Sequence, residues 1–417
     1  MALNGSGPIS LAGATEGESI AVELGESATG TIALNDTIVR DLAEVSSGAI
    51  TMPTDFWGKA SLVQGGIWTW GYGHNGQLGY NDRISRSSPI QVGIYTDWTD
   101  IAMASRHTGG VKSGELWMWG EGYFGDLGDG FQIDRSSPTQ VGALTNWAQI
   151  ASGSRMSAAI KTTGSLWMWG TGTYGRLGNS NTIGRSSPVQ VGISTDWAQV
   201  SSAFQHNAAI KTNGTLWTWA LGTYGRLGHN DTISRSSPTQ VGTLTNWAQV
   251  SAGSRSTAAV KTDGTLWTWG YGLNGRLGLN IDRFINVSSP TQVGALTNWA
   301  QVVSGFSFCI AIKTDGTIWS WGDNGNLQLG IGNGLDVSSP VQIGALTNWA
   351  QAAPGQSHTA AIKTDGTLWT WGNSGTGETA QNYRIPNLSS PVQVGALTTW
   401  AKVSSQFSAS GSIAIKQ

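Results

Sequence analysis

The chain has 417 residues, of which 59 are glycine, 22 are tryptophan and only 12% are charged, and its formal net charge is −2 at pH 7. So few charged residues argue against a solvated coiled coil or a disordered tail. The charge balance gives no sign of the basic patch that nucleic acid requires, and no apolar run reaches membrane-spanning length. Cys309 is the single cysteine, which rules out an intrachain disulfide and a multi-cysteine metal site. We therefore expect no nucleic-acid partner, no membrane insertion, no metal and no cofactor.

Residues 1–60 follow a pattern of their own. Short alternating stretches between glycines, such as ESIAVELG and GTIALND, are typical of strands. The following NDTIVRDLAEVSSG predicts one short helix at about 37–46, in which Ile38, Leu42 and Val45 share a face. A β/α segment this small buries little apolar surface by itself, so we expect it to dock on another surface.

From residue 61 onward the sequence repeats seven times. A Trp-x-Trp pair recurs at spacings of 49 to 52 residues, at Trp68/Trp70, Trp117/Trp119, Trp167/Trp169, Trp217/Trp219, Trp267/Trp269, Trp319/Trp321 and Trp369/Trp371. A Ser-Ser-Pro and a third tryptophan follow each pair, the latter at Trp98, Trp147, Trp197, Trp247, Trp299, Trp349 and Trp400. Trp57 is the only tryptophan outside this scheme.

Each repeat contains four short apolar segments, such as LWMWG, PVQVG, WAQVSS and AAIK, which are rich in β-branched and aromatic residues. Turn sequences such as KTDGT join AAIK to LWTW as a tight hairpin, and the proline is expected at the start of its strand. Four strands in each of seven units predict an all-β, seven-bladed β-propeller over residues 61–417, with the tryptophans buried between blades.

The order of the segments predicts how the ring closes. The array opens on GGIWTWG and ends on SIAIKQ, so the strand at 412–416 is the missing partner of the strand at 67–71. We expect the C-terminal strand to complete the first blade and leave no free sheet edge. The alternative is a local hairpin between 62–63 and 67–68.

The repeats resemble those of the regulator of chromosome condensation family, which carry LWTWG, a later GQLG and a following proline. Residues 67–79 (IWTWGYGHNGQLG) and 266–278 (LWTWGYGLNGRLG) are close matches, and the similarity covers 62–417. This resemblance implies the seven-bladed propeller. It implies little about function, because such propellers serve as exchange factors, in ubiquitin ligases and as scaffolds.

The N-terminal segment resembles a leader of virion structural proteins in tailed bacteriophages, cyanophages especially. The resemblance rests on Gly7–Gly13, Gly17–Gly25, Ala33–Ile50 and Phe56–Lys59. It implies that residues 1–60 attach the protein to other virion proteins. The candidate attachment residues are Ile38, Leu42, Val45, Phe56 and Trp57.

Recognition in a repeat protein is expected where the copies differ. The loops after each Trp-x-Trp-Gly vary most, and they emerge on one face of the ring. Aromatic and arginine side chains there are typical anchors for proteins or sugars. The candidate ligand-binding residues are Tyr72, Tyr123, Phe124, Tyr174, Tyr224, Tyr271, Arg176, Arg226 and Arg276. The alternative is that the tyrosines only pack on neighbouring loops.

Other polar residues recur with the blades and are expected to be structural. His107, His206 and His358 precede the AAIK segment and predict blade-to-blade hydrogen bonds. The arginines before Ser-Ser, at Arg86, Arg135, Arg185 and Arg235, are also expected to bond between blades. No catalytic constellation is present in the sequence, so we do not expect an enzyme.

These observations favour a structural protein of a bacteriophage virion, in its tail, baseplate or a surface appendage. Such a protein is synthesised in the host cytoplasm and incorporated into the virion. Its propeller would face a neighbouring virion protein or the host surface, where it would bind a glycan or an envelope protein during host adsorption. The alternative function is that of a cellular interaction scaffold or an exchange-factor-like propeller.

Overall fold

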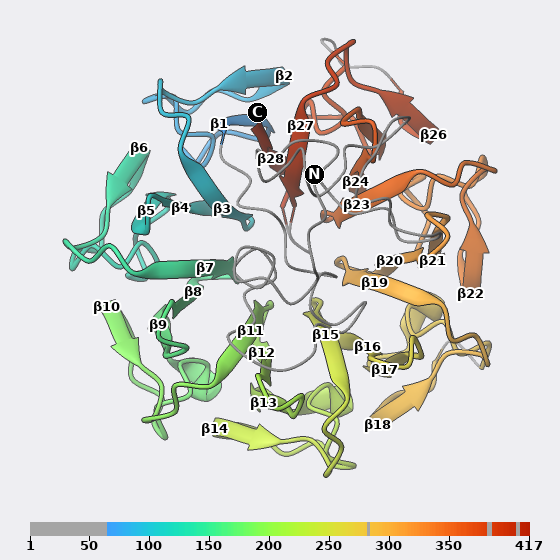
Figure 1. The fold of residues 1–417 in the computed structure, drawn as a ribbon, viewed down its shortest axis with the longest axis horizontal. Helices are drawn as coiled ribbons and strands as arrows, with labels where there is room; N and C mark the ends of the chain where they lie inside the picture. The colour runs from blue at the N-terminus through green and yellow to red at the C-terminus, as the bar shows by residue number, and fades with distance from the viewer. Residues whose placement is uncertain (1–64, 282–283, 382–385, 406–408) are drawn as a thin grey trace, which may run out of the picture. The chain divides into compact units, whose positions relative to one another are not determined.

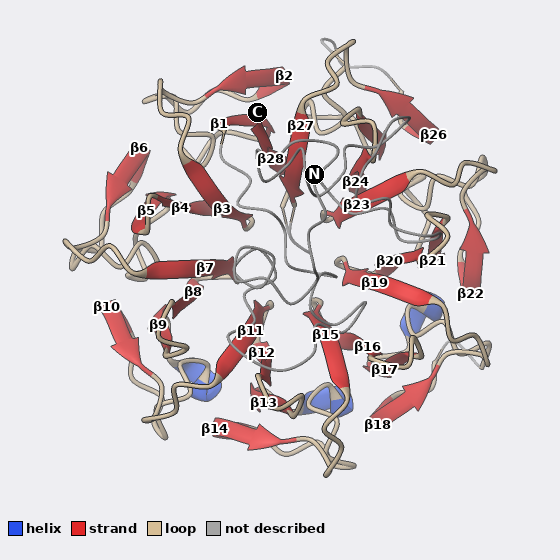
Figure 2. Ribbon diagram, viewed as in Figure 1, coloured by secondary structure: helices blue, strands red, loops and turns tan. Residues whose placement is uncertain are grey.

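The computed structural model describes residues 65–281, 284–381, 386–405 and 409–417. These residues form seven four-stranded antiparallel sheets around a common axis, with three short 3₁₀ turns (Figures 1 and 2). The predicted all-β, seven-bladed propeller with four-stranded blades is confirmed. The expected N-terminal β/α segment and its helix at about 37–46 lie outside the described residues, and the boundary after residue 60 stays a prediction.

Each blade is a meander whose first strand lies nearest the axis and whose fourth lies outermost (Figure 1). The first strands are β3 (Trp98–Met103), β7 (Trp147–Ser152), β11 (Trp197–Ser202), β15 (Trp247–Ala252), β19 (Trp299–Ser304), β23 (Trp349–Pro354) and β27 (Trp400–Ser404). The second strands are β4 (His107–Lys112), β8 (Met156–Lys161), β12 (His206–Lys211), β16 (Ser256–Lys261), β20 (Phe308–Lys313), β24 (His358–Lys363) and β28 (Gly411–Lys416).

The third strands carry the Trp-x-Trp pairs: β1 (Gly66–Gly71), β5 (Glu115–Gly120), β9 (Leu166–Gly170), β13 (Leu216–Ala220), β17 (Leu266–Gly270), β21 (Ile318–Gly322) and β25 (Leu368–Gly372). The outer strands are β2 (Arg86–Gln91), β6 (Arg135–Gln140), β10 (Arg185–Gln190), β14 (Arg235–Gln240), β18 (Val287–Gln292), β22 (Val337–Gln342) and β26 (Leu388–Gln393). The 3₁₀ turns are η1 (Thr173–Gly175), η2 (Thr223–Gly225) and η3 (Leu273–Gly275). We number the blades 1 to 6 in chain order from β3; blade 7 combines β27, β28, β1 and β2.

Tryptophans fill each blade in the same way. In blade 2, the ring of Trp147 lies edge-on to both members of the pair, at centroid distances of 6.0 Å from Trp167 and 6.5 Å from Trp169. Trp147 and Trp169 are buried, whereas Trp167 is half-buried. A buried indole removes roughly 150–250 Å² from water, which is why three tryptophans in each repeat can hold small sheets together.

The buried indole of each pair also crosses to the preceding blade. The Nε1–H of Trp169 in blade 2 donates a hydrogen bond of 2.9 Å to the main-chain oxygen of Asp126 in blade 1. Six further bonds of 2.9 to 3.0 Å complete the circle, from Trp70 to Glu378, Trp119 to Gln77, Trp219 to Arg176, Trp269 to Arg226, Trp321 to Arg276 and Trp371 to Gln328. Every junction between blades therefore has the same buried hydrogen bond.

The two ends of the propeller share blade 7. Strand β28 pairs with β1 from Gly66–Lys416 to Gly71–Gly411, and β27 pairs with β28 on its other edge. Because β1 has β2 on one side and β28 on the other, the predicted closure by the C-terminal strand is confirmed and the local hairpin alternative is wrong.

The expected position of the proline is wrong. Pro188 is the fourth of six residues in β10, and the corresponding prolines have the same place in the other outer strands. The outer strand is a sheet edge, so the missing N–H costs no ladder bond. A register shift between Arg185 and Val189 accommodates the irregular pairing with β9.

A ring of polar side chains links the innermost strands around the axis. The third residues of these strands are Asp100, Gln149, Gln199, Gln249, Gln301, Gln351 and Lys402. Glutamine side chains accept hydrogen bonds from the next blade, as from Val200 N to Gln149 Oε1 at 3.2 Å. At the closing junction an ion pair takes this place, with Lys402 Nζ 2.5 Å from Asp100 Oδ1. The charged pair thus lies between the last and the first of the innermost strands, β27 and β3.

We expect this ion pair to stabilise the closed ring. Lys402→Gln leaves the carboxylate of Asp100, whose side chain is 10% exposed, without its cation. The free energy of unfolding should fall by roughly 1–3 kcal/mol. The double variant Asp100→Gln/Lys402→Gln restores the amide arrangement of the other junctions and should recover most of the loss. Urea unfolding measures both changes, and a double variant as unstable as the single one would contradict this role.

Candidate functional site: the loop face

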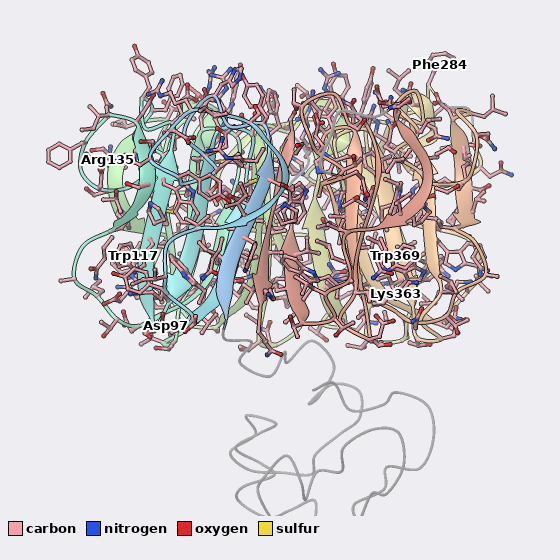
Figure 3. All side chains as sticks on the ribbon, turned by 90° about the horizontal axis from the view of Figure 1, so that it is seen from above. Asp97, Trp117, Arg135, Phe284, Lys363 and Trp369 are labelled. Carbon is pink, nitrogen blue, oxygen red and sulfur yellow. The ribbon has the colours of Figure 1, made fainter. Side chains whose placement is uncertain are left out.

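The propeller has two unlike faces. One, the loop face, carries the loops between the first and second strands and between the third and outer strands. The other, the hairpin face, carries the hairpins between the second and third strands and the connections between blades. Figure 3 shows Phe284 on the loop face and Asp97 and Lys363 on the hairpin face. Gly65, the first described residue, bridges Trp98 and so lies on the hairpin face.

All nine candidate ligand-binding residues lie in the loops between third and outer strands, on the loop face. Tyr123 is 67% exposed, Tyr174 is 50% exposed and Tyr224 is 38% exposed. Tyr72, Phe124 and Tyr271 are half-buried. Among these candidates the most exposed rings therefore lie in blades 1, 2 and 3, although Phe284 in the same loop of blade 4 is 71% exposed.

Two of these tyrosines have an unfavourable backbone conformation. Tyr174 and Tyr224, the central residues of η1 and η2, have φ angles of +63° and +64°. In blade 4 the same position is Asn274, at φ +61°. Left-handed backbone costs a residue such as tyrosine about 1 kcal/mol, whereas asparagine adopts it more readily. Strain carried by exposed aromatic side chains indicates a role other than stability.

One group of side chains, the Arg255 cluster, joins blades 3 and 4. The rings of Tyr224 and Tyr271 lie 4.5 Å apart, and the guanidinium carbon of Arg255 lies 5.8 Å and 5.4 Å from their centroids. Arg226 and Arg276 complete it, at 5.4 Å from Tyr224 and 5.1 Å from Tyr271 respectively. The cluster therefore combines aromatic surface with three cations.

A second group, the Arg155 cluster, joins blades 1 and 2. The guanidinium carbon of Arg155 lies 4.2 Å from the centroid of Phe124, whose ring meets that of Tyr123 edge-on at 5.0 Å. Tyr72 lies apart from both clusters and stacks against His74 at 4.6 Å. It lines a depression of about 300 Å³ together with Asn75, Ser105, Arg106 and Ser410.

Three of the candidate arginines support the loops from inside. Arg176, Arg226 and Arg276 are at most 7% exposed. Arg226 and Arg276 each donate to a main-chain oxygen of the next blade, those of Ser254 and Phe306, whereas Arg176 donates to that of Ser154 in its own blade. Burial, with the nearby charge of Arg255, lowers the pKa of Arg226 to about 10. A ligand could contact these groups directly only if the loops rearranged.

The arginines before the Ser-Ser-Pro motifs do not bond between blades, so that prediction is wrong. Their partners lie in the loop that leads into the same outer strand: Arg86 with Asp82, Arg135 with Asp129, Arg235 with Asp231 and Arg185 with the main-chain oxygen of Gly184.

Sequence reasoning missed two sets of residues on this face. Arg155 and Arg255 precede second strands, and their signal was a Ser-Arg that recurs at 105–106, 154–155 and 254–255. Exposed aliphatic side chains also recur two residues before the outer strand. They are Ile84, Ile133, Ile183, Ile233, Ile285 and Leu335, each 49–71% exposed.

The histidines bond between blades, as predicted. His206 Nε2 lies 2.9 Å from Thr257 Oγ1, and His358 Nε2 lies 3.0 Å from Ser412 Oγ. His107 makes the same contact with Ser157 at 3.0 Å.

The contact of His107 has the layout of a Ser-His-Asp triad. Its Nδ1 lies 3.3 Å from Asp126 Oδ2, and Ser157 Oγ donates to the main-chain oxygen of Asp126 at 2.9 Å. All three side chains are at most 1% exposed, so no substrate can reach the hydroxyl in this conformation. We interpret the triad as a junction contact like those of the other histidines. That the chain is not an enzyme stays a prediction.

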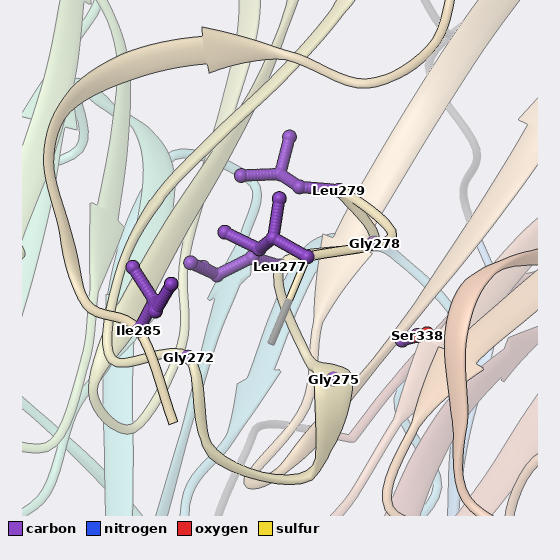
Figure 4. Close-up of a pocket in the computed structure, with 8 residues that line it drawn as sticks. Gly272, Gly275, Leu277, Gly278, Leu279, Ile285 and Ser338 are labelled. Atoms are coloured by element: carbon purple, nitrogen blue, oxygen red, sulfur yellow. The ribbon is translucent and has the colours of Figure 1, made fainter. Parts of the chain in front are cut away.

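Nothing else among the described residues forms a deep site. The pocket in Figure 4, lined by Leu277, Leu279 and Ile285, has a volume of about 10 Å³, room for one water at most. No group of three or more His, Cys, Asp or Glu side chains in the described ranges could hold a metal ion. Within them, no helix is long and apolar enough to cross a membrane. The predicted attachment residues Ile38, Leu42, Val45, Phe56 and Trp57 lie outside the described residues.

The buried histidines predict a loss of stability in acid. Burial lowers the pKa of His358 from 6.5 to about 4, so the unfolded chain binds the proton first. Stability is complete above pH 6.5 and falls as the pH approaches 4, by about 3 kcal/mol for this residue. Chemical unfolding at a series of pH values should show a shallower decline for His358→Gln than for the unchanged protein. Identical declines would contradict this assignment.

Models of two related families match the chain. A model of the RCC1-like domain matches residues 58–309. Models of the Regulator of chromosome condensation (RCC1) repeat match residues 315–362, and 299–328 and 351–378. Among curated proteins, none matches the chain in sequence.

Several solved structures have the same fold. Human WBSCR16 is 19% identical with a TM-score of 0.76, over 84% of this chain and 98% of that one. Prp20p from Saccharomyces cerevisiae is 18% identical with a TM-score of 0.74, over 86% and 93%. Yeast RCC1 (Prp20) in its complex with Kap60 is 18% identical with a TM-score of 0.74, over 85% and 90%. At such identities the likeness shows the fold alone.

Proposed function

This chain belongs to the family of RCC1-like domains, and we propose that its propeller is a non-enzymatic module that binds a protein partner through the loop face. The observation that carries this proposal is the strained, exposed aromatic surface there. Tyr174 is held at positive φ with half of its surface in water, although it could be replaced by a residue that fits the backbone better. Exposed aromatic rings beside arginine are the usual anchors of protein interfaces.

One relative gives support. Yeast RCC1 (Prp20) forms a complex with Kap60, and Prp20p has been studied for its binding to Gsp1p and histones. Propellers of this fold can therefore serve as protein-binding modules. The partner of this chain is not implied by them, because its loops differ.

Replacing exposed rings tests the loop face. Tyr123→Asn/Tyr174→Asn should lower the affinity for a partner captured by chemical cross-linking in the producing cells about tenfold. The thermal midpoint should not fall, since asparagine suits the backbone of Tyr174.

The matched control is on the opposite face. Leu244→Asn/Leu296→Asn changes two side chains of the hairpin face that are 47% and 48% exposed. It should leave that affinity unchanged. If only the control variant loses the partner, the binding surface lies on the hairpin face and the proposal is wrong.

A second candidate, the role of a bacteriophage virion component, rests on the N-terminal segment alone. Residues 7–13, 17–25 and 33–50 resemble the leader of virion structural proteins, which supports attachment of the chain to a particle by residues 1–60. In that setting the loop face would present the propeller to a neighbouring virion protein or to the host surface, as an envelope protein or a glycan.

Mass spectrometry of purified particles tests the virion role. Under this proposal the chain is found in virions in a fixed ratio to the capsid protein, and deletion of residues 1–60 removes it from them. Because the propeller has its own closed core, the deleted form should still fold, which circular dichroism checks. Particles that lack the full-length chain would exclude a virion role and leave the cellular one.

A further inference from the structure

We infer that the Arg155 and Arg255 clusters recognise carboxylate side chains of an acidic segment in the partner. This inference deepens the proposed function and rests on it, because it names the chemistry of what the loop face binds. Its basis is the guanidinium groups of Arg155 and Arg255, the aromatic rings beside them and the charges nearby.

Most arginines on the rims of the propeller are neutralised. Arg83 pairs with Asp134, Arg106 with Glu121, and Arg235 with Asp231, at 2.8 to 3.0 Å. Within the part of the chain that the structure describes, Arg155 and Arg255 have no carboxylate partner at ion-pair distance. Arg185 has no such partner among these residues either, but it bonds to the main-chain oxygen of Gly184. Arg155 and Arg255 are therefore unpaired cations that stack on aromatic rings, and a ligand can neutralise them.

Both groups are held in place by aromatic rings. Phe124 lies under Arg155, and Tyr224 and Tyr271 flank Arg255. A guanidinium group that stacks on a ring keeps its N–H edge free, and its planar fork matches the two oxygens of a carboxylate. The side chain of Arg155 is also exposed, so a ligand can reach it. Stacking on the rings reduces the side-chain entropy that both arginines lose on binding.

The buried arginines make the surroundings more positive. Beside Arg255 lie Arg226 and Arg276, and Arg176 is close enough to Arg155 for the charge of Arg155 to lower its pKa. The guanidinium group of Arg226 donates hydrogen bonds to oxygens of Thr223 and Ser254, which carry no charge. Asp323 is the acidic group near Arg276, and it is bonded to Ser307 Oγ at 2.7 Å. Positive charge therefore exceeds negative charge at both clusters.

An acidic protein segment fits these features better than other anions. The clusters combine cations with the exposed aromatic rings of Tyr123 and Tyr224, and the exposed ring of Tyr174 lies in the blade between theirs. Such rings suit apolar side chains between acidic ones. The chain as a whole has a net charge of −2, unlike proteins that bind the phosphates of nucleic acid over a broad basic surface. Local positive charge with aromatic surface thus points to a peptide that carries both acidic and apolar residues.

Peptide binding to the full-length chain tests the inference. The probe is a fluorescein-labelled peptide of alternating glutamate and tyrosine, compared with one of alternating glutamine and tyrosine by fluorescence anisotropy. We expect the glutamate peptide to bind at least about tenfold more tightly, and Arg155→Gln/Arg255→Gln to remove that preference. Lysine at both positions should restore it only in part, because an ammonium group lacks the planar fork.

Arg185→Gln is the control. Arg185 also lacks a carboxylate partner among the described residues, but no aromatic ring flanks it there, and it bonds to the oxygen of Gly184. Its replacement should leave peptide binding unchanged. Equal binding of the two peptides, or an equal loss in the Arg185 variant, would overturn the inference. Displacement of the glutamate peptide by inorganic phosphate at millimolar concentration and constant ionic strength would also overturn it, since the site would then recognise any anion.

The two experiments together distinguish a failure of this inference from a failure of the proposed function. If the glutamate peptide fails to bind while Tyr123→Asn/Tyr174→Asn still loses its partner, the loop face binds a protein of other chemistry. If the tyrosine variant keeps its partner, the proposed function itself fails.

Discussion

The buried indole of each Trp-x-Trp pair acts in two blades at once. In its own blade it packs against the tryptophan that begins the innermost strand, and its N–H reaches a main-chain oxygen of the preceding blade, as from Trp269 to Arg226. The bond is made in a dry junction, where an unpaired N–H would be costly. The same contact fixes both the filling of a blade and its distance from the next one. Seven copies of it define the ring, and the rest of the molecule is arranged around them.

The bond to a main-chain oxygen explains which loop positions are free to vary. The accepting residue is Gln77, Asp126, Arg176, Arg226, Arg276, Gln328 or Glu378 in the seven loops. Its oxygen is constant because every residue has one, whereas its side chain differs. Arg226 uses that freedom to bond to the next blade, and Asp126 to meet His107. The scaffold therefore restricts the backbone of the loop and leaves its chemistry open.

Much of the fold follows from the sequence for this reason. The spacing of the tryptophans predicted the number of blades, and the mismatch between the first and last units predicted the closure of β28 on β1. The polar ring could not be predicted, since Gln149 and Gln199 look like ordinary exposed strand residues. The sequence also does not predict whether a loop side chain points to solvent or into the propeller. Tyr224 and Arg226 are two residues apart, yet one faces water and the other is buried. The Arg255 cluster was missed because its members come from separate loops of neighbouring blades.

The loop face is not the same all around the ring, because its aromatic residues are unevenly distributed over the blades. Aromatic rings are present in the third-to-outer-strand loops of blade 7 and blades 1 to 4, whereas the described residues of these loops in blades 5 and 6 include none. The scaffold does not require this difference, because Asn274 adopts the same positive φ at the position of Tyr174 without an aromatic ring. A residue that costs stability at a position where others suffice is best explained by contact with something outside the ring. Since Arg155 and Arg255 lie among these blades, one side of the loop face combines the features on which both proposals depend.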